Sequence, residues 1–428
     1  MRLMLQSSRA INNRLAVGDF MIFILSILIV ISEVPILSRN VSNVVFYGLV
    51  FVFLVSGINV IFRLEKRKWE TIVLLCLYLI MLAIYKIFSI SSADLAYYST
   101  TVKFFFFLVA MLIVVEHMTK TQMTYILGVI LSSMLFTVID NIRLYLMYGP
   151  SVYVHLFQWE RFTTNSVNTT FVSSMLFACG ALLIAFFNTR NKLIKCGSIA
   201  FIVLSLYFIA RIAQRMIIFG LAIIMLPLIM LYNEKYSFKR ICITLVFVAC
   251  ALLLLINFEW IISKIDGVIR SERLHLRFEQ LKILFSTKNA REAGGTLSAR
   301  VELFLRSINT WFSSFGTFLF GAGDHRITND IIGNHSDYID DCARYGLLGM
   351  MIWIPFTVSY MKSIIKCSSV KKSSPLSRQI KVIICIFILN ALLSDVYEAT
   401  VGIQMFLMIP IVCSLIRQNK VLFFEVEV

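Results

Sequence analysis

Residues 167–187, VNTTFVSSMLFACGALLIAFF, are mostly apolar and carry no charged side chain. A stretch of this length, wound as an α-helix, covers the roughly 30 Å of hydrocarbon in a bilayer. Comparable runs recur along a chain of 428 residues, of which 59% are hydrophobic and 15% are charged. A water-soluble fold would have to expose too much of this apolar surface, so the sequence predicts a membrane protein.

The apolar runs predict an all-α fold, a polytopic helical membrane protein with about 12 transmembrane helices. Membrane barrels are built from short strands of alternating polarity, whereas these runs are continuous over roughly 17 to 25 residues. The expected spans are 17–37, 43–62, 70–90, 102–117, 123–147, 167–187, 197–213, 215–232, 241–257, 346–365, 380–397 and 400–416.

Basic residues gather on alternate connections between these spans. By the positive-inside rule those connections face the cytoplasm, and so do both termini. The net charge of +16 is then a topology signal, and nucleic-acid binding is not indicated. The residues concerned are Arg2, Arg9, Arg14, Arg63, Lys66, Arg67, Lys68, Arg190, Lys192, Lys195, Lys235, Lys239, Arg240, Lys366, Lys371, Lys372, Arg378, Lys381, Arg417 and Lys420.

One long connection, residues 258–345, separates the ninth span from the tenth and falls on the outer face. The chain is thereby divided into 1–257 with nine spans, the loop itself, and 346–428 with three spans and a cytoplasmic tail. Eleven basic and eleven acidic residues balance each other within the loop. That balance suits an ordered extracytoplasmic cap.

Helical periodicity recurs inside this loop. Apolar residues at helical spacing predict an amphipathic helix over 274–285, and the small polar residues and glycines of 286–296 predict a break after it. A second helix should start at Ser298 as its N-cap. The side chains expected to face inward from it are Val301, Phe304, Leu305, Ile308 and Trp311.

Residues 321–349, GAGDHRITNDIIGNHSDYIDDCARYGLLG, lie between this polar loop and the apolar tenth span. Gly321 and Gly323 indicate a turn, and a third short helix should run from about His335 into the span. Gly346 and Gly349 would let helices approach closely at the membrane edge. We expect the chemistry of the protein at this edge.

Arg211 and Arg215 break the orientation rule, because they fall between the seventh and eighth spans on the outer side. Four residues apart, they project from one face of a helix, where an arginine near hydrocarbon is costly without an anion. Pyrophosphate would offset that cost, since a guanidinium binds phosphate oxygens in bidentate fashion. The alternative is that the arginines reach the membrane surface or pair with Asp140 or Asp395.

His335 is one of five histidines and precedes Asp337, Asp340 and Asp341 closely. Histidine ordinarily titrates near neutral pH, so it could accept a proton from an attacking hydroxyl group as a general base. Taken alone, a single histidine is more often structural. His325 has no comparable surroundings and is expected to be a loop residue.

Three segments, in order, resemble motifs of the O-antigen ligase and polymerase superfamily of membrane glycosyltransferases. NHSDYIDDCARYGLLG is similar to its His-Asn/Ser-x-Tyr-Leu…Gly-x-x-Gly pattern, through His335. QRMIIFG is similar to its Ser-Arg-Gly segment through Arg215, and SARVELFLRSINTWFSSFGTFLFGAGDHRIT to its Gly-Arg…Gly-x-Gly stretch through Arg300. The resemblance covers roughly residues 205–350.

The resemblance implies that Arg211, Arg215 and Arg300 hold the pyrophosphate of an undecaprenyl-linked donor and that His335 activates the acceptor. Asp337 and Tyr338 are candidates for supporting roles, and so is Arg344, which departs from the family pattern and could serve the substrate instead. The chain also departs from the family pattern. Large residues flank Arg215, a phenylalanine stands at 304 where tryptophan is frequent, and Arg344 stands where an acid is common.

No metal or cofactor is expected. Asp340 and Asp341 are adjacent on a predicted helix, where neighbours point about 100° apart, so a shared cation is not indicated. The nine cysteines are scattered and fall mostly inside spans, which is typical of packing residues and not of disulfides or a zinc site. No phosphate-binding glycine loop with a lysine is present, which disfavours a cytoplasmic nucleotide-sugar enzyme.

Together with the resemblance, these features predict a GT-C-like, metal-independent inverting glycosyltransferase of a bacterial cell membrane. It would transfer a glycan from undecaprenyl pyrophosphate to a lipid-linked repeat unit on the extracytoplasmic face. Expected partners are the lipid-linked donor and acceptor, membrane lipid and a chain-length regulator. One alternative is a ligase that attaches the glycan to lipid A–core or protein. Another is a lipid-linked oligosaccharide flippase or other transporter, for which Glu33 and Lys86 would have to lie deep in the membrane.

Overall fold

The computed structural model describes residues 18–87, 94–159, 164–167, 169–213, 215–232, 295–323, 332–333, 336–368 and 374–424. Every regular element in these ranges is a helix. Seven of the described helical segments are long and apolar enough to cross a membrane, and three shorter apolar helices accompany them. The protein is therefore a helical membrane protein with several spans, as the sequence predicts.

The first half of the chain contains eight helices within the described ranges. They are α2 (Asp19–Glu33), α3 (Pro35–Asn40), α4 (Asn43–Ser56), α5 (Ile58–Ile61), α6 (Lys66–Ile87), α7 (Asp94–Val114), α8 (Lys120–Trp159) and α9 (Thr169–Asn188). The described part of the second half adds α10 (Lys192–Tyr207), the π-helix η1 (Phe208–Ile212), α11 (Met216–Leu231), α15 (Gly295–Trp311), α16 (Phe315–Phe320), α17 (Asp337–Cys367), α18 (Pro375–Leu393), α19 (Ala399–Gly402), the π-helix η2 (Ile403–Met408) and α20 (Ile409–Phe424).

Each expected span except the ninth coincides with one of these helices or with consecutive ones. The ninth, 241–257, and the loop helix expected over 274–285 lie outside the described residues. Where they are described, the apolar runs thus form helices at the predicted positions. The total of twelve spans stays a prediction.

The bundle is organised around α9 and the continuous run α19–η2–α20. Both are 89% buried along their membrane-length windows, whereas α10 is only 28% buried along its own. Phe104 of α7 packs against the central run, with its ring 5.1 Å from the ring of Phe406 and 5.3 Å from that of Tyr397. Helices such as α10 therefore form the rim and turn apolar side chains outward, toward lipid.

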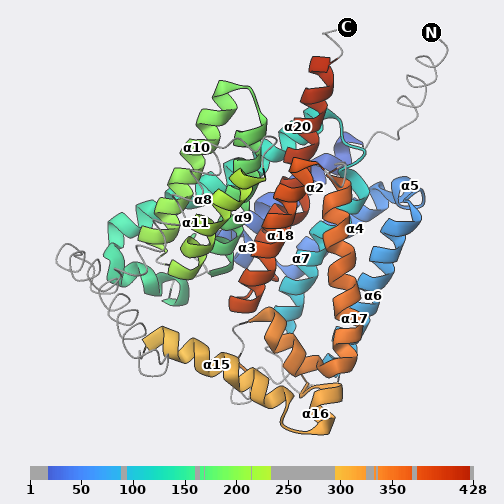
Figure 1. Cartoon of the computed structure of the whole chain (residues 1–428), viewed down its shortest axis with the longest axis vertical. Coiled ribbons are helices and arrows are strands. Elements are labelled where there is room, and N and C mark those ends of the chain that lie inside the picture. Colours follow the sequence, from blue (N-terminus) through green and yellow to red (C-terminus); the bar gives the residue numbers. More distant parts are fainter. Residues whose placement is uncertain are drawn as a thin grey trace.

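The two ends of the bundle carry different features, ion pairs at one end and the loop helices at the other. At one end Lys68 forms an ion pair with Glu116 at 2.8 Å, and Lys366 pairs with Glu65. The hydrogen bond from Lys366 holds the pKa of Glu65 below its usual value. The loop helices α15 and α16 lie at the opposite end from the one where α20 finishes, as Figure 1 shows.

The loop helices correct two details of the sequence prediction. Helix α15 begins at Gly295, so Ser298 lies within its first turns and is not the N-cap. The first turn of a helix has no intrahelical partners for its N–H groups, so a glycine costs little there. Phe304, one of the side chains expected to face inward, is 38% exposed. Ser307, which was not among them, is fully buried. Ser307 makes a polar contact to α17, which is described next.

Candidate functional site

The start of α17 is built from a reciprocal cap. The Ser336 hydroxyl oxygen accepts a hydrogen bond from the backbone N–H of Ile339 at 3.3 Å. In return, the backbone N–H of Ser336 donates to the Asp340 carboxylate at 3.0 Å. The two contacts satisfy N–H groups that a helix start otherwise leaves without partners. They explain why the helix begins at Asp337, two residues after His335.

The first turns of α17 are buried although they are rich in charge. Asp340, Asp341 and Arg344 are each at most 3% exposed. Buried charges are tolerated when they are paired and hydrogen-bonded, and here Arg344 Nη1 lies 3.2 Å from Asp341 Oδ1, one turn earlier. Arg344 is therefore engaged within the protein.

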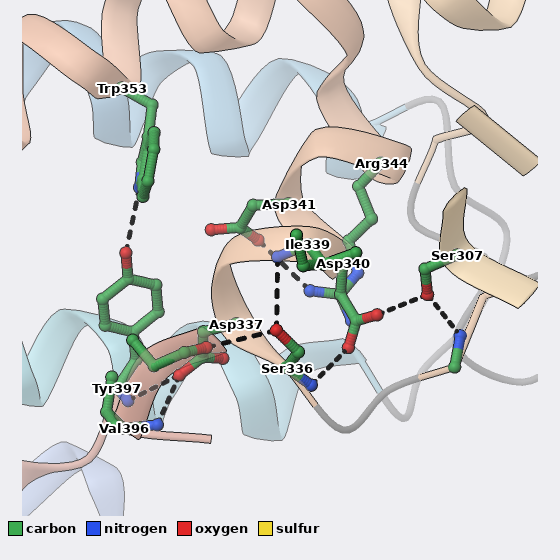
Figure 2. A network of polar contacts seen from close by, with 12 residues as sticks. Ser307, Ser336, Asp337, Ile339, Asp340, Asp341, Arg344, Trp353, Val396 and Tyr397 are labelled. Carbon is green, nitrogen blue, oxygen red and sulfur yellow. Dashed lines mark hydrogen bonds and ion pairs between the residues drawn. The ribbon is translucent and has the colours of Figure 1, made fainter. Parts of the chain in front are cut away.

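Asp340 ties α17 to the loop helix α15. The Ser307 hydroxyl of α15 donates to Asp340 Oδ1 at 2.5 Å and accepts from the backbone N–H of Gly333 at 2.8 Å (Figure 2). Gly333 leaves no room for a side chain, since a Cβ there would stand 2.2 Å from the Leu303 carbonyl oxygen. One buried serine thus joins α15, α17 and the segment that precedes His335.

Asp337 ties α17 to the connection between α18 and α19. Its Oδ2 atom accepts hydrogen bonds from the backbone N–H groups of Val396 and Tyr397, the second at 2.9 Å (Figure 2). The Ser336 hydroxyl adds a bond to the Ala391 carbonyl oxygen of α18, at 3.2 Å. A carboxylate that accepts two backbone N–H groups is firmly held.

Aromatic side chains close this region on the membrane side. The Tyr338 ring meets the Trp353 ring edge to face, with centroids 4.6 Å apart. The Trp353 indole N–H donates to the Tyr397 hydroxyl at 2.9 Å, and the hydroxyls of Tyr338 and Tyr360 are 3.4 Å apart. Tyr338 is therefore a buried packing residue that keeps its hydroxyl hydrogen-bonded.

A kink in α17 and the glycine turn after α16 fit each other. Gly346, with φ of 60°, bends α17 and releases the carbonyl groups before it. Those of Ala343 and Arg344 accept hydrogen bonds from the backbone N–H groups of Ala322 at 2.8 Å and Gly323 at 3.0 Å. The predicted turn at 321–323 is confirmed, with positive φ at both of its glycines.

The residues expected to bind pyrophosphate are distributed over three elements. Arg211 lies in η1, and Arg300 lies in α15, with the side chains of both outside the described residues. Arg215 immediately precedes α11, is half-buried, and donates its backbone N–H to the Ile209 carbonyl at 3.0 Å. Asp140, one partner considered for the arginines, forms an ion pair with Arg143 at 3.0 Å. Convergence of the three arginines stays a prediction.

His335 and His325 lie outside the described residues. Asp337, Tyr338 and Arg344, the expected supporting residues, are brought together on the buried start of α17. Sequence reasoning missed the two residues that organise this region, Ser307 and the cap role of Asp340. A serine followed four residues later by an aspartate was a usable signal for the cap, whereas nothing in the sequence distinguishes Ser307 from other helix serines.

We call this set of contacts the α17 platform: Ser307, Gly333, Ser336, Asp337, Asp340, Asp341, Arg344, Val396 and Tyr397. It fixes the backbone on both sides of the segment that contains His335. Among the described residues there is no group of three His, Cys, Asp or Glu side chains arranged to hold a metal ion. No protein-family model matches this chain, and no curated protein matches it.

Proposed function

We propose that this protein is a polysaccharide polymerase of a bacterial cell membrane. It transfers a glycan from undecaprenyl pyrophosphate to the free end of a lipid-linked repeat unit, on the extracytoplasmic face. The carrying observation is the bond between Ser307 and Asp340, which joins the helix bearing residue 300 to the helix that follows residue 335. The two segments that resemble the superfamily's arginine and histidine motifs are therefore packed against each other.

The position of Arg215 supports a site at the same end of the bundle as α15 and α16. Helix α10 starts in the basic segment around Lys192, and α10 with η1 spans 16 and 5 residues before the chain turns back at Arg215. At about 1.5 Å per residue this run is long enough to cross the roughly 30 Å of hydrocarbon. Arg215 would then face the side opposite the basic connections, which is also the side of α15 and α16.

The exposed aromatic side chains around α16 suit a location at the membrane surface. Phe312, Phe315 and Phe320 are 60%, 77% and 57% exposed around α16. The Tyr85 hydroxyl at the end of α6 donates to the Phe320 carbonyl, so α16 is fastened to the end of a membrane-length helix. Exposed phenylalanine rings on a short helix beside a membrane-length helix suit insertion into the boundary between headgroups and acyl chains.

The proposed reaction needs no metal. The acceptor hydroxyl oxygen attacks the anomeric carbon of the donor, the bond from that carbon to the pyrophosphate oxygen breaks, and His335 takes the hydroxyl proton. Arg211, Arg215 and Arg300 balance the charge that develops on the departing pyrophosphate. The α17 platform holds the backbone after His335 in place, which preserves the geometry between the base and the attacking oxygen.

An assay in detergent tests the proposal. Purified protein with lipid-linked donor and acceptor, and with no membrane or gradient present, should give a ladder of longer glycans. Transfer to lipid A–core or to a protein, in place of the lipid-linked repeat, would identify the ligase alternative. A flippase moves its substrate without lengthening it, so protein that is folded but forms no glycan with any of these acceptors would contradict a transferase.

A further inference from the structure

Glu33 is a fully buried carboxylate at the end of α2, far in sequence from the α17 platform. It is 0% exposed. Its Oε1 atom accepts a hydrogen bond from the Gln404 side-chain amide at 2.7 Å, and Gln404 is also 0% exposed. An ionisable residue inside a helical membrane bundle is costly, and such residues usually mark an ion or proton site.

The surroundings of Glu33 are rich in acceptors and poor in donors. Glu33 Oε2 and Gln404 Oε1 are both buried and make no hydrogen bond within the described part of the chain. The same holds for the hydroxyl of Thr400, one turn before Gln404 on the same helical run. Unsatisfied buried oxygens carry a substantial penalty, which a bound positive charge would remove.

No ion pair between Glu33 and a positive side chain is found among the described contacts. Arg39 of α3 donates to the carbonyl oxygens of Thr164 and Ser166, and Lys103 of α7 lies over the Phe46 ring. Helix α4 and the run α19–η2 are made of uncharged residues throughout. Helix α8 approaches with Thr137, whose hydroxyl donates to the Glu33 carbonyl oxygen at 3.1 Å, and with Met134, which contacts the Gln404 amide. The nearby charges on α8, Asp140 and Arg143, pair with each other.

Polar side chains lead from Glu33 along α8 to Asp140. Asn141, one turn beyond Thr137, donates to the Asn165 carbonyl oxygen at 2.7 Å, and the Asn165 amide donates to Asp140 at 2.8 Å. Asp140 is partly exposed. Gln404 itself lies in the π-helix η2, and π-helical segments are frequent at functional sites because they loosen the regular backbone hydrogen bonding.

We propose that Glu33, with the oxygens of Gln404 and Thr400, binds a single positive charge inside the bundle, a proton or an alkali cation. The two share the neutralisation of the carboxylate, but a proton gives Glu33 one O–H donor for a neighbouring oxygen, whereas an alkali cation is coordinated by several of these oxygens together. The site goes beyond the proposed transferase activity. It also lies next to the α17 platform in the chain, since Val396 and Tyr397, which Asp337 binds, precede Glu398, the N-cap of the run that carries Thr400 and Gln404.

Infrared spectroscopy of the purified full-length protein in detergent tests this site without any glycan substrate. Spectra are compared at neutral pH for the wild type and Glu33→Gln, in sodium chloride and in choline chloride of equal concentration. Glu65→Gln is the matched control, because Glu65 is an exposed carboxylate with Lys366 as partner. The outcome is independent of whether the protein proves to be a polymerase.

A carboxylic-acid carbonyl band that is present in the wild type and lost in Glu33→Gln, in both salts, identifies a bound proton. A carboxylate band that shifts with sodium, together with a sodium-dependent rise in melting temperature that Glu33→Gln loses, identifies an alkali cation. Absence of any Glu33-dependent band or sodium effect overturns the proposal. If Glu33→Gln does not fold, Gln404→Met is compared with the wild type in its place. A carboxylic-acid or carboxylate band that shifts in Gln404→Met supports the site, and spectra without such a shift overturn it.

Discussion

Gly346 lies so close to Gly321 that a Cβ at Gly346 would stand 2.3 Å from the Gly321 backbone nitrogen. The approach is mutual, because a Cβ at Gly321 would stand 2.1 Å from the Arg344 carbonyl oxygen. Both residues also have positive φ, which side chains rarely adopt. This contact fastens the loop helices to the kink of α17.

Gly346→Ala should therefore destabilise the protein. The unfavourable φ alone costs on the order of 1–3 kcal/mol, and displacement of the turn adds to that. We expect a lower melting temperature in detergent and loss of glycan ladder formation. Gly48→Ala in α4 is the control, because nothing lies within 4 Å of its added Cβ and alanine is the better helix former. Equal melting temperatures for the two variants would argue against the contact.

Ser307→Ala tests the link between α15 and α17. It removes one partner from the buried Asp340 carboxylate and one from the Gly333 N–H, at a cost of about 1–3 kcal/mol for each group left without its hydrogen bond. Hydrogen exchange of the α15 amides should become faster. Ser313→Ala removes an exposed hydroxyl that contacts the Thr310 carbonyl oxygen and the Thr317 hydroxyl, both within four residues of it, and should leave exchange of α15 unchanged. Unaltered protection of α15 in Ser307→Ala would contradict the link.

Asp337→Asn separates a structural role of this residue from a role in substrate binding. Asparagine keeps a side-chain oxygen that can accept from Val396 and Tyr397, but it removes the negative charge. If Asp337 acts as a clamp on that connection, the variant should fold, lose at most about 3 kcal/mol of stability, and keep measurable transfer. Complete loss of transfer in a protein with wild-type melting behaviour would instead assign the charge to the reaction.

Arg215→Lys keeps the positive charge and removes the planar guanidinium group, which can donate two hydrogen bonds to one phosphate. If the guanidinium binds pyrophosphate oxygens, transfer should fall roughly tenfold to a hundredfold, which corresponds to about 1.5–3 kcal/mol. Lysine reaches the membrane surface as well as arginine does, so near wild-type transfer at matched abundance would assign Arg215 to anchoring. The rate is measured from the growth of the glycan ladder.

His335→Ala should abolish transfer while leaving membrane insertion and melting behaviour intact, because the residue is proposed to act on the attacking hydroxyl and not in packing. His325→Ala, in the same loop, is the control and should retain activity. A residual rate in His335→Ala that rises with pH is what loss of a general base predicts, because hydroxide then takes the proton, whereas residual transfer with the pH profile of the wild type would show that His335 mainly positions the acceptor. Unchanged ladders would reject the assignment.

The sequence by itself determined the class of fold. Runs of apolar residues in a chain that cannot bury them in water must become membrane helices, because a helix satisfies its backbone within one segment. Glycine chemistry was also local enough to be predicted. The turn at Gly321 and Gly323 follows from the conformations that glycine allows, and a close approach at Gly346 was predicted from its small size. The positive φ of Gly346 and the kink that it makes in α17 were not predicted.

Only the tertiary structure decided which polar residues are engaged inside the protein. Ser307 and Asp340 are 33 positions apart in the sequence, and Glu33 and Gln404 are 371 apart. No periodic pattern in the sequence predicts either contact. A hydrogen bond between distant segments depends on how helices rotate against each other, and that rotation is set by the summed packing of many apolar contacts. For the same reason the spacing of Phe304 suggested the interior although its side chain is 38% exposed, whereas Ser307 on the same helix is buried and bonded to Asp340.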